Sequence, residues 1–103
     1  KSAMSESLKV VFSKSGDMRF ISHLDLVRMF QRASRRAEVP VTVTKGFSPH
    51  LKISIQKALK LGVESMGEEA VFYLDAKVSP EEFVRKMNSN LPEGVKMVKA
   101  EYS

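Results

Sequence analysis

The sequence predicts a single α+β domain in which four strands and two helices follow the order β-α-β-β-α-β. Three observations indicate this class. Short runs rich in β-branched and aromatic residues occur near both ends of the chain and between them. Two segments, beginning near residues 23 and 80, repeat apolar residues at helical spacing. The chain has 103 residues with 43% apolar content, which is enough for one hydrophobic core and too little for two.

The chain is predicted to begin with a strand and a helix. Residues 1–7 are small and polar, and we expect them to form a flexible lead-in to a domain of residues 8–103. Residues 8–14 are β-branched and aromatic and predict a central strand. Ser22 precedes an acid by three residues, a typical helix-capping pattern, and predicts a helix over residues 23–37.

This first helix is predicted to have an apolar face and a basic face. At 100° per residue its apolar residues fall on one arc, which should pack on the sheet. Four arginines fall on the opposite arc and form what we call the arginine stripe: Arg28, Arg32, Arg35 and Arg36. Arginine donates forked hydrogen bonds that match phosphate geometry, whereas a solvated face more often mixes lysine and glutamate. The stripe is therefore a candidate polyanion-binding surface, with a solvated basic helix as the alternative.

The middle of the chain is predicted to hold the second strand and an insertion. Residues 41–44 alternate valine and threonine after Pro40, and proline is tolerated at the first position of a strand. Residues 45–67 then form the insertion before the next principal strand. Within it, residues 53–55 alternate isoleucine and serine and predict a short extended piece.

The second half of the chain is predicted to hold a strand, a helix and a last strand. Residues 68–78 carry apolar side chains on both faces, so this strand should lie inside the sheet. Ser79 followed by Pro80 is a strong helix start. Residues 95–102 form the last strand. This order is that of the split βαβ, ferredoxin-like fold, an antiparallel sheet with both helices on one face. We therefore expect one shared core containing Val10, Phe12, Phe30, Phe72, Leu74, Phe83 and Met87.

A turn-rich polar segment, residues 45–52, is not explained by the needs of a small core, and we call it the 45–52 loop. Gly46 permits backbone angles closed to other residues, and Pro49 fixes its own φ. Four side chains suited to an anionic or π-faced ligand lie in this short span: Lys45, Phe47, His50 and Lys52. The 45–52 loop is therefore a second candidate binding element.

Charge is concentrated in the same region. The net charge is +5, yet residues 26–60 carry eight basic residues against one acid, while the rest of the chain carries nine basic and eleven acidic residues. A near-neutral body with a basic middle third is expected where one face meets a polyanion.

Several classes of function are disfavoured by what the sequence lacks. The absence of cysteine excludes disulfides, thiolate metal sites, Fe–S clusters and cysteine nucleophiles. No apolar run approaches the roughly 18 to 20 residues of a membrane span, and no signal-peptide pattern opens the chain, so we expect a cytoplasmic protein with no membrane partner. Asp25, His23 and His50 would form a metal site only if the loop folded back over the helix start, which the spacing does not require. We therefore expect no metal, no cofactor and no catalytic residue, with enzymatic activity left open.

The two histidines have different interpretations. His23 lies in the first helical turn at the edge of the apolar arc, so a packed neutral imidazole is favoured there, with a ligand-facing role as the alternative. His50 lies in a loop beside Pro49, where a ligand-facing role is favoured and local packing is the alternative.

Three motifs in order resemble the signatures of the radical SAM-linked domain of unknown function, the DUF2344 family. They are Ser-His-Leu-Asp at residues 22–25, Gly-Phe-Ser-Pro-His at 46–50 continuing through 52–54, and Leu-Gly-Val-Glu-Ser at 61–65. The resemblance covers about residues 8–103. It implies an accessory role beside a radical SAM protein, in trans or as a fusion, and around RNA or ribosomes. Many members have a proline where this chain has Leu51, and the radical SAM cysteine triplet is absent, so radical chemistry would belong to a partner.

Three functions follow from the sequence. The first is an accessory module that binds structured RNA, in which Phe47 and His50 contact an exposed base. Phosphate contacts would come from the arginine stripe and from four lysines: Lys45, Lys52, Lys57 and Lys60. The second is a docking module for a radical SAM partner or its protein substrate, since a basic face also meets acidic proteins. The third is a metal-independent ribonuclease that uses His50 or His23 as acid and base, an analogy at the level of the fold.

Overall fold

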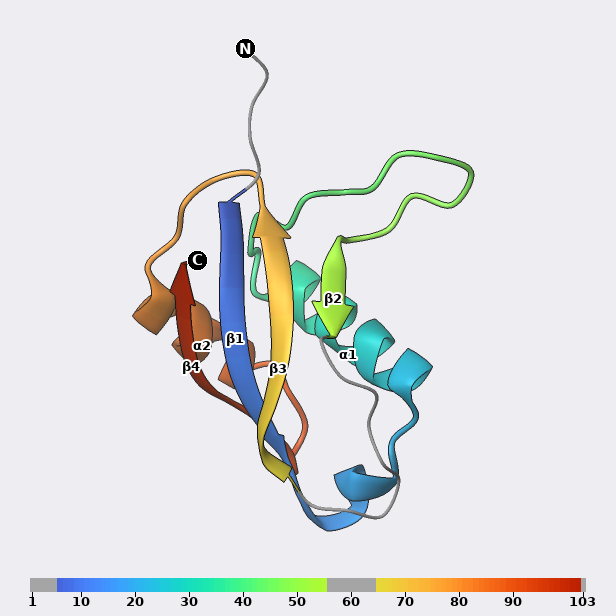
Figure 1. Cartoon of the computed structure of the whole chain (residues 1–103), viewed down its shortest axis with the longest axis vertical. Helices are drawn as coiled ribbons and strands as arrows, with labels where there is room; N and C mark the ends of the chain where they lie inside the picture. The colour runs from blue at the N-terminus through green and yellow to red at the C-terminus, as the bar shows by residue number, and fades with distance from the viewer. Residues whose placement is uncertain (1–5, 56–64, 103) are drawn as a thin grey trace.

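The computed structural model of the chain describes residues 6–55 and 65–102, and contains a four-stranded antiparallel sheet and two α-helices (Figure 1). The elements in chain order are β1 (Glu6–Lys14), the 3-10 helix η1 (Gly16–Phe20), α1 (His23–Arg36), β2 (Ile53–Ile55), β3 (Ser65–Leu74), α2 (Pro80–Asn88) and β4 (Val95–Tyr102). The predicted α+β class with an antiparallel sheet is confirmed.

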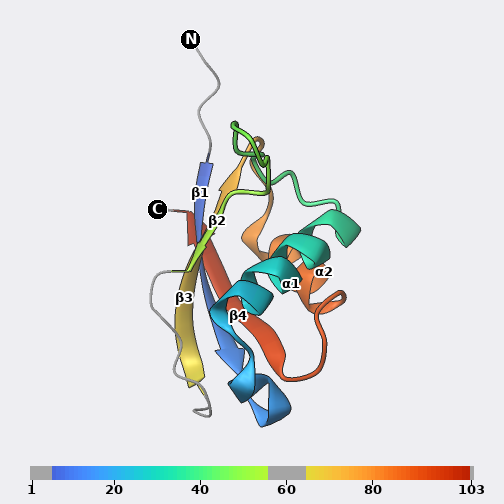
Figure 2. The ribbon, with the colours of Figure 1, turned by 90° about the vertical axis from the view of Figure 1, so that its right-hand side faces the viewer.

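The sheet is built around β1, which pairs with β3 on one side and β4 on the other, in the order β2-β3-β1-β4. Leu8 shows the register, because it lies opposite Phe72 of β3 and Tyr102 of β4. The predictions of a central first strand and an interior third strand are both confirmed. Figure 2 shows α1 and α2 on the same side of the sheet, and no helix of the described residues covers the other face.

Both α-helices begin where their sequence signals predict. The Ser22 side-chain oxygen accepts a hydrogen bond from the Asp25 N–H over 3.1 Å and caps α1. Ser79 caps α2 in the same way through the Glu82 N–H at 3.3 Å. These bonds satisfy backbone donors that the first turn of a helix leaves unpaired. The predicted starts of both helices are therefore confirmed in their physical detail.

The C-terminal end of α1 places a glutamate where glycine is usual. Glu38 has a φ of +58°, and its N–H donates to the Arg35 carbonyl over 3.2 Å. The next residue, Val39, donates its N–H to the Ser34 carbonyl over 3.0 Å, which completes the Schellman pattern. A residue with a Cβ atom is strained in this left-handed conformation, so the helix ends at an energetic cost.

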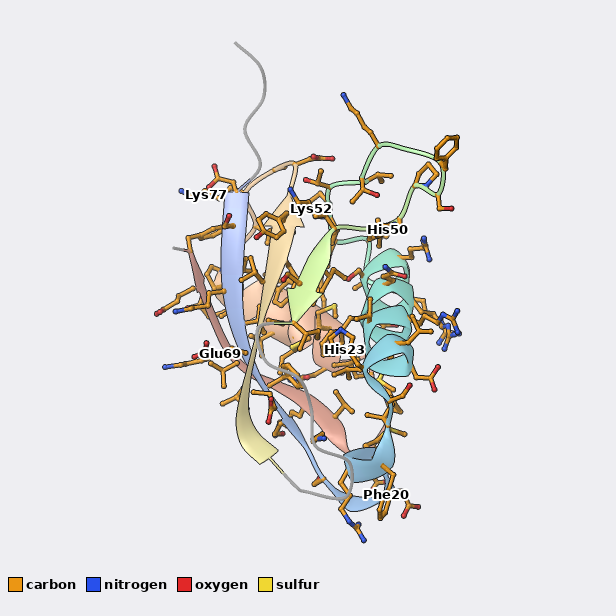
Figure 3. The ribbon with its side chains drawn as sticks, turned by 45° about the vertical axis from the view of Figure 1, so that its right-hand side comes forward. Phe20, His23, His50, Lys52, Glu69 and Lys77 are labelled. Atoms are coloured by element: carbon orange, nitrogen blue, oxygen red, sulfur yellow. The ribbon has the colours of Figure 1, made fainter. Side chains whose placement is uncertain are left out.

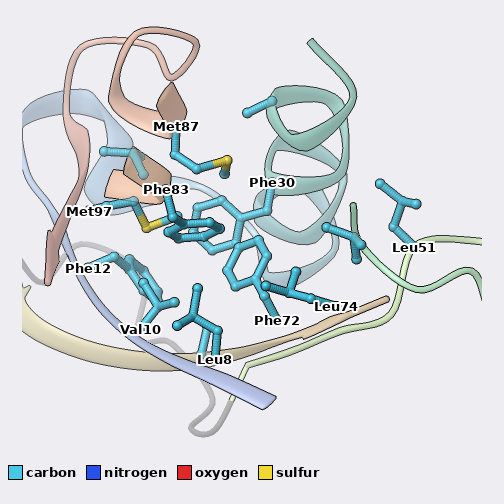
Figure 4. Packing of buried hydrophobic residues seen from close by; sticks show 14 of the residues in the cluster. Leu8, Val10, Phe12, Phe30, Leu51, Phe72, Leu74, Phe83, Met87 and Met97 are labelled. Carbon is cyan, nitrogen blue, oxygen red and sulfur yellow. The ribbon is translucent and has the colours of Figure 1, made fainter. Parts of the chain in front are cut away.

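Four phenylalanines connect both helices with the two central strands (Figure 4). The ring centroid of Phe30 on α1 lies 5.1 Å from that of Phe12 on β1 and 5.7 Å from that of Phe72 on β3. Phe72 in turn lies 5.0 Å from Phe83 on α2, with the ring planes at 73°. All four rings are buried, as are the other members of the predicted core, Val10, Leu74 and Met87. The predicted shared core is confirmed.

The predicted second strand at residues 41–44 is wrong. Val41 and Val43 form only isolated bridges, to Leu74 and Leu51 respectively. Further along β3, residues 53–55 occupy the same edge, so residues 41–44 have no continuous partner there. The strand next to β3 is therefore Ile53–Ile55, and the 45–52 loop precedes it, between α1 and β2.

Three strand boundaries differ from the prediction. β3 begins at Ser65, three residues earlier than expected, which shortens the predicted insertion. β1 begins two residues early because Glu6 and Ser7 lie opposite residues of β3. β3 ends at Leu74 because Asp75 turns away from the sheet, with its N–H bonded to the Pro40 carbonyl at 2.8 Å. Predictions that fall outside the described residues concern residues 1–5, the segment 56–64 with Lys57 and Lys60, and most of the third motif.

The contacts among the four phenylalanine rings predict a large loss of stability when Phe83 is truncated. The substitution Phe83→Ala should lower the free energy of unfolding by about 3 to 5 kcal/mol, because it leaves a cavity in the core. Urea denaturation followed by circular dichroism measures this change. Phe20→Ala is the matched control, because Phe20 is 56% exposed and contacts Arg19. A similar loss in both variants would contradict the assigned core.

The strained end of α1 predicts a stabilising substitution. Glu38→Gly should raise the free energy of unfolding by about 1 kcal/mol, because glycine adopts the left-handed conformation without a Cβ clash. The control Glu38→Ala removes the charge but keeps the Cβ atom, and it should give no comparable gain. If the alanine variant gained as much in thermal melts, the charge and not the backbone would be the cause.

Candidate nucleic-acid interface

The structure exposes the whole arginine stripe. The buried face of α1 consists of Leu26, Phe30, Ala33 and Ser34, so the opposite face points to solvent. Arg28 lies 3.9 Å from the carboxylate of Asp25, with both side chains more than half exposed, a pair worth little. The other three arginines form no ion pair within the described residues. Their guanidinium groups are available to an external anion.

The base of the 45–52 loop is fixed by hydrogen bonds. The Thr44 N–H donates to the His50 carbonyl over 2.7 Å, and the His50 N–H donates back to the Thr44 hydroxyl over 3.2 Å. Leu51 is buried and joins the hydrophobic core. Gly46, with φ of +133°, adopts a conformation that favours glycine. The loop is therefore anchored at its base, and it turns at Gly46, whose backbone conformation favours glycine.

The tip of the loop presents an aromatic ring to solvent. Phe47 is fully exposed and has no aromatic or cation–π partner within the described residues, and Lys45 nearby is also exposed. Val43, two residues before the loop, is 52% exposed. The ring is therefore available for contact with a flat ligand, as the sequence predicts for this loop.

The ring of His50 is oriented by the loop itself. Its Nδ1 lies 2.9 Å from the Ser48 carbonyl oxygen and 3.3 Å from the Thr44 hydroxyl. A carbonyl oxygen only accepts, so Nδ1 carries the proton in that bond and Nε2 of the neutral ring is an acceptor. Nε2 makes no hydrogen bond to any described residue. The exposed imidazole thus offers a ligand one positioned acceptor.

The loop and the arginine stripe are joined through Gln31. Its side-chain amide donates to the Leu51 carbonyl over 3.3 Å. Arg28 and Arg35 lie three and four residues from Gln31 and so share its flank of the helix. Sequence reasoning missed Gln31 and treated Thr44 only as a strand residue, because neither role has a local sequence signal.

The structure separates Lys52 from the other loop residues. Its ammonium nitrogen lies 4.5 Å from the ring centroid of Tyr73, over the face of the sheet opposite α1 and α2. Figure 3 shows Lys52 over the strands, apart from His50. Alternation along an extended segment places neighbouring odd and even residues on opposite sides. Lys52 is therefore not part of the surface formed by the stripe and the loop tip.

The matching family model is described as an uncharacterized protein conserved in bacteria (DUF2344), and it matches residues 7–103. The chain belongs to the DUF2344 family. The match includes both the arginine stripe and the 45–52 loop, so both are parts of the family domain. No curated protein matches the chain. Within the described residues, no helix has the length and apolar character to cross a membrane.

The two histidines of this DUF2344 domain do not come together. His23 is the first residue of α1, and Figure 3 shows it near the helix start while His50 lies at the other end. A helix of 14 residues is about 21 Å long. His23 is exposed, so its favoured interpretation as a packed residue is wrong. Among the described residues, no three His, Cys, Asp or Glu side chains gather as metal ligands would.

The exposed tip predicts that Phe47 contributes little to folding. Phe47→Ala should change the free energy of unfolding by less than about 0.5 kcal/mol, as for other surface substitutions. Leu51→Ala, four residues later at the buried base, should cost about 2 kcal/mol or more. Paired urea titrations measure both changes. A loss above about 1 kcal/mol for the Phe47 variant would show that its ring packs within the fold.

Proposed function

We propose that this DUF2344 domain is a non-catalytic RNA-binding accessory module that uses the arginine stripe together with the 45–52 loop. One observation carries the proposal: a fully exposed Phe47 stands at the tip of an anchored loop that bonds to α1 through Gln31, and three arginines on the exposed face of that helix form no ion pair within the described residues. A base of the RNA stacks on the Phe47 ring while the phosphates of the RNA strand bind the guanidinium groups. His50 adds a positioned acceptor for a base edge.

Structured RNA suits this surface better than a regular duplex. Sequence-specific contacts to RNA go mainly to loops and bulges, whose unstacked bases reach aromatic side chains. A single aromatic ring on a projecting loop fits one such base. Stacking on an aromatic side chain contributes roughly 1 to 3 kcal/mol per base. The phosphate contacts then set the register of the strand and carry no sequence information.

The open face of the sheet is a poorer candidate for this role. The ring of Tyr73 on that face is already covered by Lys52. Lys9 and Glu101 lie opposite each other on neighbouring strands, and both are exposed, so the two charges offset. These features favour the helix side for the polyanion.

We also infer that the fold is the ferredoxin-like split βαβ arrangement. The strand order β2-β3-β1-β4 and the position of both helices on one face support it. For the partner, we propose a radical SAM protein, in trans or as a fusion. Support for this comes from the resemblance of the three motifs to the radical SAM-linked family, and from a chain that itself has no cysteine for a cluster.

A second function is favoured by Val43. Its half-exposed side chain lies two residues before the 45–52 loop, and two exposed apolar residues, Val43 and Phe47, only four positions apart also suit a protein surface. The alternative is therefore a docking module for the radical SAM partner or its protein substrate. Pull-down from cell extract before and after RNase treatment separates the two, because protein docking survives digestion of the RNA.

The phosphate contacts predict a strong salt dependence of RNA affinity. A plot of log K against log salt should be linear, with about four to six contacts that each add roughly 0.7 to 0.9 to the slope. Charge reversal at Arg28 and Arg35 should weaken binding to all RNA sequences alike, because phosphates are the same in each. Fluorescence anisotropy with a labelled stem-loop RNA over a salt series measures this. A salt-independent complex would favour the docking alternative.

The exposed ring predicts a loss of affinity of a different kind. Phe47→Ala should weaken RNA binding by about 1 to 3 kcal/mol and leave the salt slope unchanged, because stacking is largely uncharged. Phe20→Ala is the control, since Phe20 is exposed but lies in η1, away from the loop. The same anisotropy assay applies. Unchanged affinity in the Phe47 variant would remove the loop from the interface.

A further inference from the structure

A cavity of about 380 Å³ lies between α1 and the turn that follows α2. Its lining residues are Met29, Arg32, Ala33, Arg36, Ser89, Asn90, Leu91 and Pro92. The two helices lie side by side on one face of the sheet in Figure 2. The volume falls within the range of about 300 to 1,000 Å³ that is typical of small-molecule sites. The cavity is thus large enough for a ligand of that class.

The cavity has an apolar floor and a cationic mouth. Ala33 is buried, and Met29 and Leu91 are half-buried among the core residues. Arg32 and Arg36 are exposed and lie four residues apart, so their side chains are neighbours on the helix. Two forked donors above an apolar surface fit a flat group that carries an anion, with phosphate matching the donor geometry best.

In the part of the chain that the structure describes, the opposite wall of the cavity forms no ion pair with these arginines. Residues 89–92 read Ser-Asn-Leu-Pro and contain no carboxylate. Three of the last carbonyls of α2, those of Arg85, Lys86 and Met87, already accept hydrogen bonds within the turn. Ser89 donates its N–H and its hydroxyl to the Arg85 carbonyl, over 3.1 and 3.0 Å, and the Asn90 side-chain amide donates to the Lys86 carbonyl over 2.9 Å. The capping bonds at these three carbonyls therefore come from Ser89 and Asn90 and not from Arg32 or Arg36.

The arginine stripe divides into two pairs with different surroundings. Arg28 and Arg35 flank Gln31, on the side of α1 that bonds to Leu51 of the loop. Arg32 and Arg36 line the cavity on the other flank. The two pairs carry the same charge on the same helix, so one is a matched control for the other.

We propose that this cavity is a nucleotide subsite, in which Arg32 and Arg36 bind a phosphate and the base packs on Met29 and Leu91. The inference rests on the proposed RNA-binding function and adds a second base position on the far flank of α1 from the loop. The same chemistry has two sources, a free nucleoside monophosphate or one unpaired nucleotide of an RNA strand.

Titration of the full chain with AMP, inorganic phosphate and adenosine tests the subsite. Calorimetry and amide chemical shifts detect the binding. AMP should bind more tightly than phosphate or adenosine alone and should shift the amides of residues 89–92. The double variant Arg32→Ala/Arg36→Ala should lose at least tenfold in AMP affinity, while Arg28→Ala/Arg35→Ala should stay within about twofold. Leu91→Ala should weaken AMP but not phosphate. Equal losses in the two arginine pairs, or no AMP binding, would overturn the subsite.

A second set of titrations distinguishes a free nucleotide from an RNA nucleotide as the ligand. It also distinguishes failure of the subsite from failure of the proposed RNA-binding function. If the RNA strand is the source, a stem-loop RNA should compete with AMP, and its affinity should fall more in the Arg32/Arg36 variant than in the control pair. RNA binding that depends on Phe47 but equally on both pairs would overturn the subsite and leave the proposed function intact. AMP binding without RNA binding would support a free-nucleotide site and contradict the RNA function. Tighter binding of a phosphoserine peptide than of AMP would overturn the nucleotide assignment.

Discussion

The contact between the rings of Phe12, Phe30, Phe72 and Phe83 is the interaction on which the rest of this structure depends. Each ring comes from a different element, β1, α1, β3 and α2 in that order. Neighbouring centroids lie 5.0 to 5.7 Å apart, two of the three pairs edge to face, which is the favoured geometry for aromatic rings. The rings therefore fix the rotation of α1 about its own axis. With Phe30 directed at the sheet, the arginine stripe lies on the exposed side of α1.

The loop follows from a second constraint, the shared edge of β3. The Thr42 N–H donates to the Tyr73 carbonyl over 2.7 Å, and the Tyr73 N–H donates to the Lys52 carbonyl over 3.2 Å. Thr42 before the loop and Lys52 at its end thus meet at one residue of β3. The intervening residues must leave the sheet and return. That excursion carries Phe47 away from the core and brings the base of the loop against α1 through Gln31.

The helix starts were predictable from the sequence, because they depend on neighbouring residues. The competition between two segments for the edge of β3 was not predictable. The starts of both helices depend on Ser22 and Ser79, whose capping bonds involve residues only three positions away. Residues 41–44 have an ideal strand pattern, yet β3 offers its edge to residues 53–55 instead. That choice depends on register with Phe72, about twenty residues away in sequence, and no local signal reports it. The cavity was missed for the same reason, since it exists only where the turn after α2 meets Arg32 and Arg36.

The central claim is that RNA binds the helix side of the domain, across the arginine stripe and the 45–52 loop. Ultraviolet cross-linking of the full chain to a stem-loop RNA, with the linked residues identified by mass spectrometry, tests it most directly. The account predicts cross-links at Phe47 and within residues 23–36, and their loss when excess unlabelled RNA competes. Cross-links confined to Tyr73 and its neighbours on the open face of the sheet would contradict it.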